Sequence, residues 1–132
     1  MGNVNLLAVV LGAAAFFAVG ALWYTALFGK AWQRQVGLSE EQLKGANMPL
    51  IFGLTFLFEM LVSLMLGHNI ARTDPSDRAI MMMAAGFGLT IMVPAIGINY
   101  LYQRKSGTLF AIDAGHLVLG TAAMGVVHVL LR

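Results

Sequence analysis

Apolar residues dominate four long stretches of the chain, and short polar segments separate them. The stretches cover about residues 5–28, 49–71, 78–102 and 108–131. Each is close to the ~20 residues that a helix needs to cross a hydrocarbon core of ~30 Å. A spanning segment must also satisfy its backbone hydrogen bonds internally, which favours helices. We therefore expect an all-α, polytopic membrane protein, built as one domain around a bundle of four transmembrane helices.

The polar segment between the first two stretches, residues 29–48, is long enough to hold structure of its own. Ser39 opens the sequence Ser-Glu-Glu-Gln, which matches a capping box and predicts that a short helix begins there. Ahead of it, apolar and basic side chains interleave, at Lys30, Trp32, Arg34 and Val36. This part either lies in the membrane interface or belongs to an ordinary solvated loop.

Pro94 lies inside the third stretch. Its ring removes a backbone N–H and clashes with the preceding turn of a helix. We therefore expect a kink there, with a freed carbonyl that a neighbouring group or water satisfies.

The composition agrees with a membrane protein. Hydrophobic residues make up 59% of the 132 residues and charged residues only 11%, against about a quarter in soluble domains. The mean hydropathy is +0.80. Because cysteine is absent, disulfides, thiolate metal sites and thiol nucleophiles are excluded. The net charge of +2 is small and evenly spread, so nucleic acid is not an expected partner.

The basic residues predict an orientation. Five Lys and Arg residues lie in segments 29–48 and 103–107, against three on the opposite side. Because cytoplasmic loops retain such residues, we expect these two segments in the cytoplasm and both termini outside, in a bacterial inner membrane. Residues 1–4 contain no Lys or Arg, so the charged start of a secretory signal is missing and the first stretch is expected to remain uncleaved.

Glu59 is the strongest candidate for a functional side chain. It lies about ten residues into the second stretch, ~15 Å from the boundary by the helical rise. An ionisable group at this depth is costly to insert, and packing alone rarely justifies it. Steps of four residues place Thr55, Ser63 and Gly67 on the same helical face. We expect this small, polar face to turn towards other helices, where the alternative role is purely structural.

A second set of polar residues lies closer to the boundary on the side of segments 29–48 and 103–107. Asp113 and His116 share a face of the fourth stretch, and matching depths occur at Tyr24, Asn99 and Tyr100. We expect these residues to form a polar layer, with His116 and Glu59 progressively deeper, as the lining of a path to the membrane centre. The alternative is that they are interhelical hydrogen bonds worth ~0.6 kcal/mol each.

Histidine and methionine gather near the opposite boundary, at His68, His128, Met81, Met82 and Met83. Thioether and imidazole ligands suit Cu(I), and two histidines can bracket a haem. Methionine is also a common gap-filler in cores. We therefore expect no cofactor, with copper or haem as the alternative. No phosphate-binding glycine loop, zinc motif or nucleophile elbow is present in the sequence, so an enzyme is the least favoured class.

Several segments together resemble a known family. They read GALWY, GKAW, GLSEE, KGANM, PAIGINY and DAGH, and begin at Gly20, Gly29, Gly37, Lys44, Pro94 and Asp113. In these segments the chain is similar to the four-helix membrane family catalogued as domain of unknown function 1761. The resemblance implies a four-span bundle of bacterial or fungal membranes and no assigned activity, so it brings no list of catalytic residues.

Two classes of function fit these features. The favoured one is a homo-oligomer that moves a proton, an ion or a small solute, with Glu59 as the titrating site and Asp113 with His116 as an entry relay. The other is a non-catalytic accessory or assembly subunit, which docks another membrane complex through its glycine-rich helix faces and the loop at residues 29–48.

Overall fold

The computed structural model describes residues 3–132, and this part of the chain is helical with no strand. Two short helices, α2 (Gly29–Val36) and α3 (Glu40–Lys44), lie between the first and second spans. The spans are α1 (Leu6–Leu22) with η1 (Trp23–Leu27), then α4 (Met48–Thr73), then α5 (Asp77–Gly86) with η2 (Phe87–Met92) and α6 (Val93–Tyr102), and finally α7 (Gly107–Leu130).

All four spans are long and apolar enough to cross a membrane, which confirms the predicted all-α architecture. Their bounds lie within two residues of those expected from the hydrophobic pattern. Met1 and Gly2, where the predicted uncharged leader begins, lie outside the described residues.

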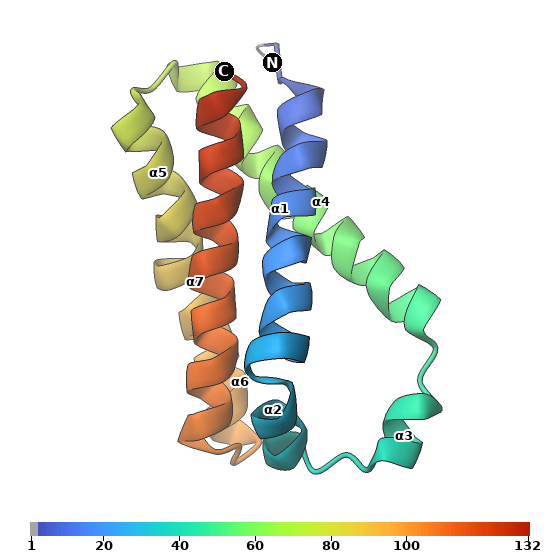
Figure 1. Cartoon of the computed structure of the whole chain (residues 1–132). Coiled ribbons are helices and arrows are strands. Elements are labelled where there is room, and N and C mark those ends of the chain that lie inside the picture. Colours follow the sequence, from blue (N-terminus) through green and yellow to red (C-terminus); the bar gives the residue numbers. More distant parts are fainter. Residues whose placement is uncertain (1–2) are drawn as a thin grey trace.

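Helix α7 is central to the bundle. It packs against α1 on one side and against the third span, α5 to α6, on the other (Figure 1). Helix α4 crosses α1 at a steep angle near the two termini, and its first half leaves the bundle. The termini lie at one end, while α2 and the turn at residues 103–106 lie at the opposite end.

Side-chain caps fix where the helices begin. Four polar residues each accept a hydrogen bond of 3.1 Å from the backbone N–H three residues later, at Asn5, Asn47, Ser76 and Ser106. Such a cap contributes about 1 kcal/mol. The predicted capping box is confirmed, because Ser39 and Gln42 satisfy each other's backbone N–H groups at the start of α3.

The proline of the third span changes the backbone in a different way from a simple kink. The helix continues through Pro94, and the six residues just before α6, Phe87–Met92, are π-helical. Because proline lacks an N–H, the carbonyl four residues earlier has no helical donor, and a wider turn accommodates the altered hydrogen bonding. A second π-helical segment, Trp23–Leu27, ends the first span.

Small residues let the helices approach closely. A Cβ added at Gly125 would lie 2.6 Å from the Cβ of Ala84, so α7 and α5 touch almost backbone to backbone there. Phe16 of α1 lies over Gly120 of α7 in the same way and is buried with Leu66, Ala84 and Met124 in the core. Close contacts of this kind are typical of helix packing in membranes.

Candidate functional site

Asp113 connects three elements at the end of the bundle near α2. Its Oδ1 accepts a hydrogen bond from the Tyr24 hydroxyl of η1, and its Oδ2 accepts one from the Tyr100 hydroxyl of α6. Both carboxylate oxygens therefore have donors, although the residue lies inside a span. We call Tyr24, Tyr100, Asp113 and His116 the aspartate cluster.

His116 extends this cluster one helical turn deeper. Its Nδ1 is 3.5 Å from the Tyr24 hydroxyl, and its ring lies edge-on to the Tyr24 ring with centroids 5.0 Å apart. The other ring nitrogen, Nε2, is buried, has no hydrogen-bond partner within residues 3–132 and faces Gly20 of α1. A Cβ at Gly20 would lie 2.9 Å from that nitrogen, so the glycine makes room for the imidazole.

Trp23 fastens the same end of α1 to α7. Its indole N–H donates to the Ile112 carbonyl at 2.8 Å. Its ring also lies against Gly115, where an added Cβ would be 2.7 Å from Cζ2. The indole thus helps to hold Tyr24, its neighbour in sequence, within reach of Asp113.

Asn99 does not join the cluster. Its side chain is exposed on the outside of α6, whereas Tyr100 is half-buried and turned towards α7. Depth along a helix places both residues at one level, but consecutive residues point about 100° apart around the axis. The predicted layer therefore gathers Tyr24, Tyr100, Asp113 and His116 without Asn99.

Glu59 is buried on the inner face of α4, with 5% of its surface exposed. Its Oε1 atom has no hydrogen-bond partner among the described residues. Helix α4 packs mainly on α1, so the buried face that carries Glu59, Ser63 and Gly67 turns towards α1. Thr55, one turn earlier, is half-buried.

Ser63 and His128 form a second polar contact, close to the termini. The Ser63 hydroxyl and His128 Nε2 lie 2.9 Å apart, and both residues are buried. A Cβ at Gly12 of α1 would lie 2.7 Å from the Ser63 oxygen. From the sequence, Ser63 was grouped with Glu59, and His128 with the histidines and methionines. Gly12, which allows three helices to meet here, was the signal that could have linked them.

The histidines and methionines near this end do not converge on one point. His128 bonds to Ser63, while His68 is half-buried with a buried Nδ1 that has no partner in the part of the chain that the structure describes. Met81 lies against Gly125, Met83 packs on the core, and Met82 points outward with 65% of its surface exposed. Within residues 3–132, no three His, Asp or Glu side chains are grouped as metal ligands.

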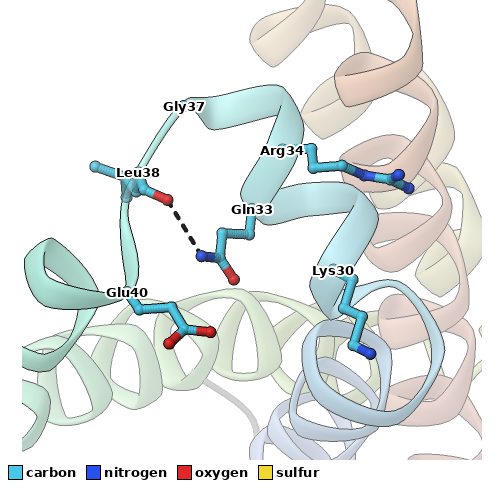
Figure 2. Close-up of a pocket in the computed structure, with 6 residues that line it drawn as sticks. All are labelled: Lys30, Gln33, Arg34, Gly37, Leu38 and Glu40. Carbon is cyan, nitrogen blue, oxygen red and sulfur yellow. Dashed lines mark hydrogen bonds between the residues drawn. The ribbon is translucent and has the colours of Figure 1, made fainter.

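A shallow hollow of about 480 Å³ lies between α2 and the start of α3 (Figure 2). Lys30 and Arg34 of α2 line it together with Glu40 of α3, and the charged ends of the two basic side chains point away from the loop that carries Glu40. Gly37 turns the chain there with φ at +73°, a conformation that side chains disfavour. Gln33 donates to the Leu38 carbonyl across the turn at 3.3 Å.

The two ends of the bundle differ in how their charges are paired. Near the termini, Arg132 forms ion pairs with Asp77 at 3.0 Å and with Asp74 at 3.4 Å. At the opposite end, within the described residues, none of the basic side chains forms an ion pair. There the Ser106 hydroxyl bonds to Gln35 and joins α2 to the turn before α7.

Comparison with known proteins places these residues in a family. The family model described as "Protein of unknown function (DUF1761)" matches residues 7–129, which include the aspartate cluster, Glu59 and the Ser63–His128 contact. No curated protein and no solved structure matches the chain. The resemblance found in the sequence is thereby confirmed.

Proposed function

The chain belongs to the DUF1761 family, and we propose that it forms a homo-oligomer through which a proton, or another small ion or solute, crosses the membrane. The observation that carries this proposal is Glu59, buried in the middle of α4 with a carboxyl oxygen that no group in the described chain satisfies. An intramembrane carboxyl of this kind is costly and typically marks a transport pathway.

The charges in the spans support this role. The only Lys and Arg residues in the four spans are Arg72 and Arg78, each next to the end of its helix. Glu59 therefore has no basic side chain at its own depth. A transferred proton or a bound cation would compensate the carboxylate there, and the compensation would be lost again when the ion moved on.

Polar side chains of other helices face α1 at two levels, at Gly12 and at Gly20. Gly12, ~9 Å along α1 by the helical rise, faces Ser63 and His128. Gly20, ~21 Å along the helix, faces His116. Helix α4 runs opposite to α1 (Figure 1). Glu59 precedes Ser63 by four residues in α4 and therefore lies one turn from it in the direction of Gly20. The Glu59 carboxyl thus lies between the Ser63–His128 contact and the aspartate cluster.

Phe16 lies between the Ser63–His128 contact and the aspartate cluster. It lies on α1 between Gly12 and Gly20, is 1% exposed, and packs over Gly120 with its ring 5.3 Å from that of His116. An aromatic ring at this place fills the space between α1 and α7 in the observed conformation. We assign Phe16 the role of the barrier in the proposed pathway.

The four spans of one chain enclose little volume, so the proposed pathway requires further copies of the chain. Residues 48–54 at the start of α4 are all exposed, which leaves a helix surface free for another protomer.

The decisive experiment measures proton flux into liposomes that contain the purified full-length protein. Glu59→Gln is expected to abolish the flux, while Glu41→Gln, an exposed carboxyl on α3 outside the spans, leaves it unchanged. Flux in Glu59→Gln equal to that of the unmodified protein would remove Glu59 from the mechanism. No flux of protons, cations or small solutes with the unmodified protein would remove the transport class.

The exposed start of α4 also favours the second candidate, an accessory or assembly subunit of a membrane complex. An uncovered apolar helix can dock against a different membrane protein as well as against a copy of itself. Purification in a mild detergent separates the two candidates. A stoichiometric partner of different sequence supports the accessory subunit, and a homo-oligomer alone contradicts it.

For the orientation, we propose that α2, α3 and the turn at residues 103–106 face the cytoplasm of a bacterial inner membrane, with both termini outside. Support comes from the basic residues gathered at that end, since cytoplasmic segments retain them. The chain has no cysteine, so Ser106→Cys and Ser76→Cys are a matched pair of single labels on opposite ends. A membrane-impermeant thiol reagent applied to intact cells should label the second and spare the first.

A further inference from the structure

A groove of about 240 Å³ lies between α6 and α7, next to the turn that joins them. Leu101, Phe110 and Gly97 line it from inside the spans. A Cβ at Gly97 would lie 3.1 Å from Phe110 Cε1, so a larger side chain there would press against the Phe110 ring. Lys105, in the turn between the two helices, also lines the groove.

The turn holds the backbone of its two basic residues in place. The Lys105 backbone N–H donates to the Tyr100 carbonyl at 2.9 Å, and the Arg104 N–H donates to Leu101 at 3.2 Å. Arg104 adopts a left-handed conformation with φ at 57°, which closes the helix end as a C-terminal cap does. These bonds fix the backbone of Arg104 and Lys105 at the end of α6, and the Lys105 side chain lines the groove.

The charge around the groove is positive. Five Lys and Arg residues lie at this end of the bundle, against the two acids Glu40 and Glu41. The ion pairs formed by the described residues all involve Arg132, at the other end. Lys105 and Arg104 are thus available to an anionic ligand at the level where the third span ends.

We propose that this groove binds an anionic phospholipid, with the phosphate at Lys105 and Arg104 and the first part of an acyl chain between Leu101 and Phe110. A phospholipid presents a charged phosphate at the membrane boundary and apolar acyl chains below it, which matches the basic turn and the apolar lining of the groove. Leu101 and Tyr102, 80% and 86% exposed, are open to the lipid on the outer side of α6. Basic residues next to a span attract anionic headgroups.

The site also touches the aspartate cluster. Tyr100 lines the groove, and its hydroxyl donates to Asp113. A lipid in the groove therefore packs against one of the two donors that hold Asp113. This site does not depend on the proposed transport, and its occupancy can be measured without any flux.

Native mass spectrometry of the full-length protein, purified from liposomes containing equal amounts of phosphatidylglycerol and phosphatidylcholine, tests the proposal. The unmodified protein should retain phosphatidylglycerol in preference to phosphatidylcholine. Lys105→Gln should lower the retained phosphatidylglycerol roughly fivefold, the factor that corresponds to the ~1 kcal/mol attraction of one basic residue near the surface. Lys44→Gln, a matched loss of charge on α3, should leave it unchanged.

Filling the groove tests the acyl-chain part. Gly97→Leu should release the retained lipid, whereas Gly86→Leu, at a glycine of α5 with open space around it, should not. Equal retention of the two lipids by the unmodified protein overturns the proposal. So does a loss in Lys44→Gln as large as in Lys105→Gln, because it would indicate general surface charge. If Gly97→Leu proves too unstable to purify, the comparison of the two lysine variants decides.

Discussion

Ser63 and His128 are hydrogen-bonded at 2.9 Å across the interface of α4 and α7, and Gly12 of α1 lies directly against both. Three helices from different parts of the chain meet at this contact. The close approach leaves no room for a methyl group at Gly12, because its Cβ would lie 2.7 Å from the Ser63 oxygen and 3.0 Å from His128 Nε2.

Gly12→Ala is therefore expected to destabilise the protein. Breaking the contact leaves a buried hydroxyl and a buried imidazole without partners, which costs about 1–3 kcal/mol. Unfolding in mixed detergent micelles with increasing dodecyl sulfate measures the change. Gly86→Ala is the control, because its Cβ would meet open space and alanine is the better helix former by about 1 kcal/mol. Equal effects of the two substitutions would contradict the close packing at Gly12.

The tyrosine hydroxyls that hold Asp113 are expected to contribute to stability as a unit. Tyr24→Phe or Tyr100→Phe leaves one carboxylate oxygen without its donor, at a cost of about 1–3 kcal/mol each. The double variant should lose less than the sum of the two, because the residues share one partner. The same unfolding assay gives all three values.

Tyr102→Phe supplies the control for this series. The Tyr102 side chain is 86% exposed, so loss of its hydroxyl should change the stability by less than about 0.5 kcal/mol. A change as large as that in Tyr100→Phe would show that the assay responds to tyrosine hydroxyls in general.

Glu59→Leu separates a functional carboxyl from a structural one. Because Oε1 has no partner among the described residues, replacing Glu59 by an apolar side chain should raise the stability, by up to ~2.5 kcal/mol on insertion scales. The same variant should lose proton flux. A clear loss of stability in Glu59→Leu would instead assign the carboxyl to packing, as the structural alternative holds.

Phe16→Leu tests the barrier in the proposed pathway. A smaller side chain over Gly120 should open the filled space between the Ser63–His128 contact and the aspartate cluster and raise proton flux severalfold in liposomes. Phe58→Leu, on the lipid-facing side of α4 with 61% exposure, should leave the flux unchanged. Reduced flux in Phe16→Leu with normal folding would show that the ring is not a barrier.

The sequence predicted the helices better than their contacts. The spans follow from composition and length, and Tyr24, Tyr100 and Asp113 meet because their depths match. Depth does not give direction around a helix, so Asn99 was wrongly grouped with Tyr100, its neighbour. The contact of Ser63 with His128 depends on the angle at which α4 crosses the bundle, and no local pattern in the sequence encodes that angle. A kink was expected at Pro94, and the π-helical segment before it was not.

The steep crossing of α4 bears on how this long helix fits a bilayer. With 26 residues, the helix is ~39 Å long, about 9 Å more than a typical hydrocarbon core, and tilting is one of the ways in which a bilayer accommodates such a length. Ser63 and Gly67 contact α1 and α7 at the crossing point, so any change of tilt would have this contact as its pivot. A thinner or thicker bilayer would swing the free end at residues 48–54 furthest. Glu59, one turn from the pivot, would keep its burial while the outline of the protein adapts to the membrane.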